Sequence, residues 1–169
     1  MDSPPGKPTD RYRQKLLSIT GFTKLKNVLL WFFFAGALVG FCLARIAYLD
    51  VNNVYRKNAG PGEWFWFRQP LYKAGLRAHL GAAIPLGLLV VIQFLPVIRR
   101  RVIFLHRING YICLALLMVS NVGALIIVRR AFGGSLISQT FVGVLALATT
   151  YTAAQAYYSV KKLRLDLHR

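Results

Sequence analysis

The stretch "INGYICLALLMVSNVGALIIV", residues 108–128, contains no charged side chain. An α-helix rises about 1.5 Å per residue, so a run of this length crosses the roughly 30 Å hydrocarbon core of a bilayer. Three further uncharged runs lie at 27–44, 80–98 and 131–160. The whole chain is 56% hydrophobic and 16% charged, which is too apolar for a soluble domain of 169 residues. The sequence therefore predicts a membrane protein.

Cationic clusters stand between or beside these runs, at 56–57, 99–101, 129–130 and 161–164. Apolar runs bounded by cations are typical of helical membrane proteins, because the backbone must satisfy its own hydrogen bonds in lipid. We expect an all-α polytopic membrane protein whose four transmembrane helices form an antiparallel bundle. The expected spans are about 27–49, 76–98, 104–128 and 134–160.

The ends of the chain are basic and carry no long uncharged run. Residues 1–26 are expected to form a cytosolic leader, disordered over the Pro-rich first ten residues. The remainder, 11–26, either lies along the anionic cytoplasmic leaflet or acts only as a topology signal, and we favour the second. Residues 161–169 form a basic cytosolic tail. No cleavable signal peptide is expected, because the first run is long and starts after residue 26.

The net charge of +17 is distributed unevenly along the chain. Six Lys and Arg residues lie in 1–26, four in 99–107 and four in 161–169, all on one side of the predicted membrane. The opposite side has four in 50–75 and two in 129–133. The positive-inside rule then places both termini in the cytosol. This pattern follows the topology, so we expect no nucleic-acid partner.

Several classes of activity lack their residues in this sequence. All five acids lie outside the uncharged runs, so no intramembrane carboxylate supports proton or cation coupling. A phosphate-binding glycine loop, a His-Glu-x-x-His motif and a Gly-x-Ser-x-Gly motif are also absent. Hydrolytic and nucleotide-dependent functions are therefore disfavoured, and the sequence favours a protein that is not an enzyme.

Aromatic and cationic residues near the predicted span ends indicate the membrane interface. Trp64 and Trp66 lie in the loop "GPGEWFWFRQPLYKAGLRAH", 60–79, which we expect to fold back onto the outer leaflet. Arg45 and Arg77 are expected to reach the headgroups with their long side chains.

Two glycines on the first span form a small-xxx-small pattern. Gly36 and Gly40 predict close helix packing, either inside the chain or between the subunits of a homo-oligomer.

The three histidines, His79, His106 and His168, are candidate ligands of haem b. A b-type haem in a membrane normally takes two axial imidazoles, from opposite faces of the ring. With a cytosolic N-terminus, His79 lies near the outer end of its helix and His106 near the inner end, so these two cannot share a haem. His106 and His168 both lie at the inner side and form a possible pair. Gly110, one turn after His106, suits either a macrocycle or close helix packing. An interfacial histidine beside arginine is more often a headgroup or capping contact, and we favour that interpretation.

The order of these motifs resembles a known family. The segment "AHLGAAIPLGLLVVIQFLPVIRRRVIFLHRINGYI", 78–112, followed by "KKLRLDLHR", 161–169, is similar to the membrane proteins grouped as domain of unknown function 2306. In that family, a histidine opens one helix, a Gln-Phe-x-Pro end leads through a basic turn to Leu-His-Arg-x-x-Gly, and a later His-Arg begins another helix. The matching residues here are His79, Gln93, Phe94, Pro96, Arg99 to Arg101, His106, Arg107, Gly110, His168 and Arg169.

The resemblance covers about half of the chain and implies a multi-pass membrane protein without an established activity. Its recurring helix-end histidines are similar in kind to those of b-type cytochromes. The family pattern continues into further membrane helices, whereas this chain stops at Arg169. Either a truncated sequence or a natural short form explains the difference, and His168 would then lie on a frayed terminus.

Three functions stay open at this point. We favour a non-catalytic integral membrane protein of unestablished activity. The alternative is a transmembrane b-type haem protein, with His106 and His168 as an inner pair and His79 as half of an outer site. A weaker alternative is a lipid or small-solute transporter, in which Ser120, Asn121 and the polar run at 149–158 line a cavity. Such polar residues more often form hydrogen bonds between helices.

Overall fold

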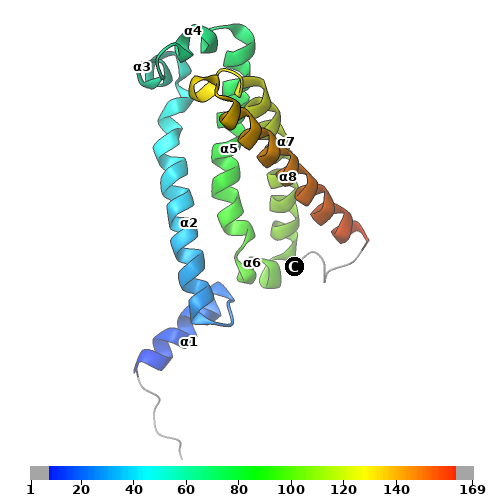
Figure 1. The fold of residues 1–169 in the computed structure, drawn as a ribbon. Helices are drawn as coiled ribbons and strands as arrows, with labels where there is room; N and C mark the ends of the chain where they lie inside the picture. Colours follow the sequence, from blue (N-terminus) through cyan, green and yellow to red (C-terminus); the bar gives the residue numbers. More distant parts are fainter. Residues whose placement is uncertain (1–7, 163–169) are drawn as a thin grey trace, which may run out of the picture.

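The computed structural model describes residues 8–162, which fold into helices without any strand. Four long helices follow one another in alternating directions (Figure 1). They are α2 (Leu25–Ile46), α5 (Pro70–Gln93), α7 (Ile103–Ile127) and α8 (Leu136–Lys161). Each is long and apolar enough to cross a membrane. This arrangement confirms the predicted fold class.

Shorter elements occupy the two ends of the bundle. α1 (Pro8–Thr20) and α6 (Pro96–Arg101) lie at one end, where α8 also finishes (Figure 1). The opposite end has the elements that join α2 to α5 and α7 to α8. These elements are the turns η1 (Ala47–Leu49) and η2 (Val51–Tyr55), the short helices α3 (Arg56–Asn58) and α4 (Glu63–Phe67), and the turn η3 (Ala131–Gly134). We call this group, residues 47–67 and 131–134, the cap.

The second long helix is displaced from its expected position at 76–98. It begins at Pro70, because proline lacks the N–H that the first helical turn leaves unbonded and its φ already suits a helix. It ends at Gln93, and Leu95 is extended with φ −78° and ψ 116°. A residue before proline is disfavoured in the α conformation, so Pro96 separates α5 from α6.

The most extensive helix contact joins α5 to α7. A Cβ atom on Gly123 would lie 2.6 Å from the backbone nitrogen of His79 and 2.7 Å from the carbonyl oxygen of Gly75. A Cβ on Gly75 would lie 2.7 Å from a side-chain carbon of Ile126. Helix association in lipid depends on such van der Waals contact, since burying apolar surface from lipid gains little. The sequence analysis did not identify these two glycines.

α2 packs against α5 at a different glycine. A Cβ on Gly87 would lie 2.5 Å from the sulfur of Cys42, which is buried. By contrast, a Cβ on Gly36 or Gly40 would have no atom within 4 Å. No atom of residues 8–162 therefore packs against the Gly36 and Gly40 positions within the chain. Packing between subunits stays a prediction.

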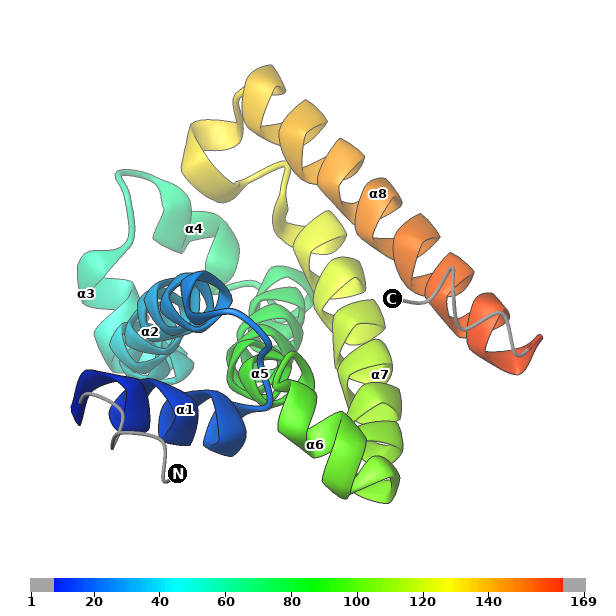
Figure 2. The same cartoon turned by 90° about the horizontal axis from the view of Figure 1, so that it is seen from below.

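α8 lies beside α7 and apart from α2 (Figure 2). The Asn121 side-chain amide lies within hydrogen-bonding distance of the Ala146 carbonyl oxygen at 3.3 Å and of the Thr149 and Thr150 hydroxyl oxygens at 3.0 and 3.1 Å. Further along, the rings of Tyr111 and Tyr157 meet with centroids 6.3 Å apart. The polar residues at the start of the run at 149–158 therefore hydrogen-bond to α7.

At the basic end of the bundle, the turn after α1 lies close to the start of α6. Gly21 has φ +77°, and a Cβ there would lie 2.6 Å from the backbone nitrogen of Val97. A positive φ suits glycine, and the missing side chain lets the turn after α1 touch the start of α6. Arg99, Arg100 and Arg101 on α6 are exposed.

We predict that Gly123→Ala destabilises the protein by about 1–3 kcal/mol, because the added methyl group overpacks the contact between the α5 and α7 backbones. Gly143→Ala on α8 is the matched control, since a Cβ there meets nothing within 4 Å. The control should be neutral or more stable by up to about 1 kcal/mol, from helix propensity alone. Thermal unfolding of the detergent-purified variants measures both changes, and equal effects would contradict the assigned contact.

Candidate functional site

The cap is packed around a buried aromatic residue. Phe67 is 0% exposed and forms a core with Val51, Leu76 and Ile127. Phe67 therefore packs against the bundle itself, and the predicted contact of the loop with the outer leaflet stays a prediction. Phe65, two residues earlier, is 52% exposed.

The two tryptophans of the cap each face a cation of the chain. The Arg130 guanidinium lies 3.5 Å from the ring centroid of Trp66, and that of Arg56 lies 5.7 Å from the ring of Trp64. Cation–π attraction of this kind strengthens where water is excluded. Both rings are half-buried, so they help to hold the cap on the bundle, and their predicted place at the membrane interface stays a prediction.

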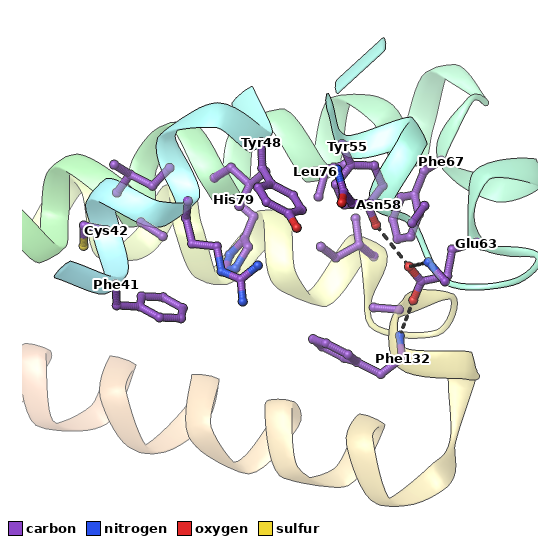
Figure 3. A pocket seen from close by; sticks show the side chains of 18 of the residues that line it. Phe41, Cys42, Tyr48, Tyr55, Asn58, Glu63, Phe67, Leu76, His79 and Phe132 are labelled. Atoms are coloured by element: carbon purple, nitrogen blue, oxygen red, sulfur yellow. Dashed lines mark hydrogen bonds between the residues drawn. The ribbon is translucent and has the colours of Figure 1, made fainter. Parts of the chain in front are cut away.

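Glu63 joins the two chain segments of the cap. Its Oε1 accepts a hydrogen bond from the backbone N–H of Phe132 at 2.7 Å. Its Oε2 accepts from the N–H of Gly60 at 3.1 Å and from the hydroxyl of Tyr55 at 3.4 Å (Figure 3). Burial raises the pKa of Tyr55, and the negative charge of Glu63 raises it further, so Tyr55 stays a hydrogen-bond donor. Phe132 has φ 53°, an uncommon left-handed conformation for a residue with a side chain, and its bond to Glu63 helps to hold it there.

A cavity of about 700 Å³ lies under the cap, between α2, α5 and the end of α7 (Figure 3). This volume is typical of sites for small molecules. The part of its wall farther from the cap is apolar and comes from Leu38, Phe41, Cys42, Ala83 and Ile84. Phe41 is 59% exposed, so the cavity is open beside this residue. Polar side chains line it nearer the cap, namely Arg45, Tyr48, Tyr55, Asn58, Glu63 and His79.

His79 is oriented by α7. Its Nδ1 lies 3.1 Å from both the carbonyl oxygen and the hydroxyl oxygen of Ser120. A carbonyl oxygen only accepts, so Nδ1 donates and the lone pair of the neutral ring is on Nε2. No side chain among residues 8–162 bonds to that Nε2. When a histidine binds a metal ion through one ring nitrogen, its other ring nitrogen commonly donates a hydrogen bond of this kind, which fixes the orientation of the ring.

Arg45 contributes a positive charge to the same cavity. Its guanidinium lies 5.3 Å from the ring centroid of Phe41 and 5.1 Å from that of Tyr48. Within the described part of the chain, no carboxylate pairs with it. Arg45 is exposed in the last turn of α2, so its predicted contact with the headgroups stays a prediction. The sequence analysis did not foresee that this residue also lines a cavity.

His106 lies at the other end of the α5–α7 pair. The Asn109 amide donates to the Gln93 Oε1 at 2.8 Å and to the Leu89 carbonyl at 3.1 Å. These bonds fix the Gln93 amide so that its nitrogen faces the Nε2 of His106 at 3.5 Å. A Cβ on Gly110 would lie 3.1 Å from the same amide nitrogen.

The structure does not bring the two described histidines together. His79 contacts α7 at Ser120, fourteen residues beyond His106, which corresponds to about 21 Å along a helix. One haem does not reach both side chains. His168 lies outside the described residues, so its pairing with His106 stays a prediction.

Other predicted residues lie away from the cavity. Arg77 is exposed on α5 and does not line it. Ser120 and Asn121 do not line it either, and nor does the polar run at 149–158. Glu63 was set aside in the sequence analysis because it lies outside the spans along the chain. Only the folding of the loop between α3 and α4 brings it to the cavity.

The sequence is similar to a family of membrane proteins and to a fungal protein. The sequence model of DUF2306, described as a predicted membrane protein, matches residues 77–169. The "Ava biosynthesis cluster protein G" of Aspergillus versicolor is 24% identical over 172 residues, a match that covers 88% of this chain. The same match covers 51% of that protein, so the chain spans about half of its length. No solved structure matches the chain.

Proposed function

The chain belongs to the DUF2306 family of predicted membrane proteins, and from this premise we propose that it binds a small amphipathic molecule within the bilayer without catalysing a reaction. The observation that carries this proposal is the cavity of about 700 Å³ with apolar deep walls and a polar upper wall. Pockets that are mostly apolar and have a few placed polar groups are the usual sites of small ligands.

The chemistry of the lining supports binding more than catalysis. Both oxygens of Glu63 already accept hydrogen bonds from the cap, so this carboxylate is committed to holding the cap together. His79 has a bond to Ser120 through Nδ1, but no hydroxyl or thiol of residues 8–162 is bonded to its Nε2 as a nucleophile would be. The ring instead offers its Nε2 to a bound molecule.

We predict that Ala83→Phe blocks the cavity, because Ala83 lines its deep wall and the larger ring occupies that space. Fluorescence titration with a dansyl-labelled fatty acid should show binding to the wild-type protein, and the variant should bind at least about tenfold more weakly, the effect of losing 1.4 kcal/mol. Ala148→Phe, at an exposed position of α8, is the control and should bind normally. Equal binding by Ala83→Phe and the wild type, at unchanged thermal stability, would refute the cavity as the binding site.

A second candidate function is haem binding through His79. What favours it is the bond from Nδ1 to Ser120, which leaves the Nε2 lone pair for a metal. The cavity beside His79 would then receive the macrocycle, with the second axial ligand coming from outside residues 8–162.

If haem binds in this way, protein purified from haem-supplied cells will show a Soret band that is lost in His79→Ala and kept in His106→Ala. If the inner pair of His106 and His168 binds the haem instead, the Soret band will be lost in His106→Ala and kept in His79→Ala. Oxidised and dithionite-reduced absorption spectra distinguish the two. A wild-type protein without a Soret band would exclude both arrangements.

For orientation, we propose that both termini are cytosolic and that the cap faces the other side of the membrane. The support is the concentration of cations at the α1 end, which the positive-inside rule assigns to the cytosol.

The orientation predicts opposite labelling of two introduced cysteines, in a background with Cys42→Ser and Cys113→Ser. Lys57→Cys in the cap should react with a membrane-impermeant maleimide on intact cells or sealed vesicles of native orientation. Lys26→Cys should react only after permeabilisation. Both lysines are exposed, so accessibility within the fold does not bias the comparison. The reverse labelling pattern would contradict the proposal and place the cap in the cytosol.

A further inference from the structure

We infer that the ligand of the cavity is a single-chain amphiphile with an anionic headgroup, bound at Arg45 and Tyr48 with its chain directed toward the deep end. This inference rests on the proposed binding function and adds the charge, the shape and the orientation of the ligand.

The orientation follows from the order of lining residues along the helices. On α2, Leu38, Phe41 and Cys42 precede Arg45, and the turn η1 after α2 adds Tyr48. The seven residue steps from Leu38 to Arg45 correspond to a rise of about 10 Å. On the antiparallel α5, Ile84 and Ala83 lie deeper than His79, which is nearer the cap. The polar side chains of the lining are therefore confined to the cap end of the cavity, where Phe67, Leu76 and Ile127 also line it, and the far end is apolar. A lipid monolayer likewise has its polar groups at one end.

The charge of the headgroup follows from the hydrogen-bonding state of the polar residues. Arg45 has no carboxylate partner among the described residues, and the hydroxyl of Tyr48 has no hydrogen bond there either. The Arg45 guanidinium lies 5.1 Å from the Tyr48 ring centroid, so the two side chains are neighbours at the cavity. Figure 3 shows the Tyr48 side chain at the cavity. A carboxylate or a phosphate accepts from both donors, and the bond to a guanidinium is charge-assisted.

Other headgroups suit these walls less well. A cationic headgroup would need a free carboxylate, and Glu63, the acid among the lining residues, already accepts three hydrogen bonds. A neutral headgroup would gain no charge-assisted hydrogen bond from the exposed Arg45 guanidinium, whereas an anionic headgroup would. The apolar part of the lining excludes small inorganic anions as the main ligand, because they would leave that wall unfilled.

The test is competition against the dansyl-labelled fatty acid on the full chain in neutral detergent. We expect an unlabelled long-chain fatty acid to displace the probe at least about tenfold better than the fatty alcohol of equal length, the effect of one charge-assisted hydrogen bond. In Arg45→Gln this preference should fall to less than about threefold. Arg77→Gln is the matched control, since Arg77 is exposed near the same end of α5 but does not line the cavity, and it should keep the preference. Lysophosphatidate serves as a third competitor, and its rank against the fatty acid identifies the headgroup as phosphate or carboxylate.

Two results would overturn the inference. One is equal displacement by acid and alcohol in the wild type, and the other is an acid preference that survives in Arg45→Gln. If binding nevertheless remains sensitive to Ala83→Phe, only the anionic headgroup is wrong and the cavity keeps its binding role. If no competitor displaces the probe and Ala83→Phe has no effect, the proposed function fails as well.

Discussion

The structure depends on the backbone contact between α5 and α7, where Gly75 and Gly123 leave no room for a side chain. In lipid, helices gain little from burying apolar surface, so this close contact is a main source of their association. The same contact sets Ser120 opposite His79 and thereby fixes the ring on the cavity wall. At the other end of the pair, the Gln93 and Asn109 amides bond across the same two helices beside His106. One helix pair thus explains the places of both described histidines.

The cap is irregular backbone at the end of a membrane bundle, and its polar groups need partners there. Glu63 supplies three acceptor contacts, which join the loop between α3 and α4 to the turn before α8. Phe67 and Val51 add an apolar core beneath it. Because the Glu63 carboxylate is bonded to these groups, it does not pair with Arg45. Among the described residues, the Arg45 guanidinium is therefore a positive charge at the cavity without a carboxylate partner.

The cavity combines two parts of the chain with different relations to the family. The family match begins at residue 77, so it includes His79 and the α5 and α7 walls. Arg45, Tyr48 and Glu63 lie before it. The family match therefore covers most of α5, all of α7 and α8, and residues 131–134 of the cap, whereas α2 and residues 47–67 of the cap lie outside it. The Aspergillus versicolor relative is about twice as long as this chain, so about half of that protein has no counterpart in the match.

The sequence by itself determined the number of long helices, their alternating direction and the basic end, because bilayer thickness and hydrogen-bond satisfaction act on runs of residues that can be read one after another. It also separated His79 from His106, since helix direction alone places them at opposite ends. The sequence did not reveal which glycines pack. Gly36 and Gly40 match a motif, but no atom of residues 8–162 lies within 4 Å of a Cβ there, whereas Gly75 and Gly123 match no motif and lie at a backbone contact. It also did not place Glu63 and Arg45 at one cavity. Contacts of that kind depend on helix rotation and on how a loop folds back, and only the tertiary structure decided those.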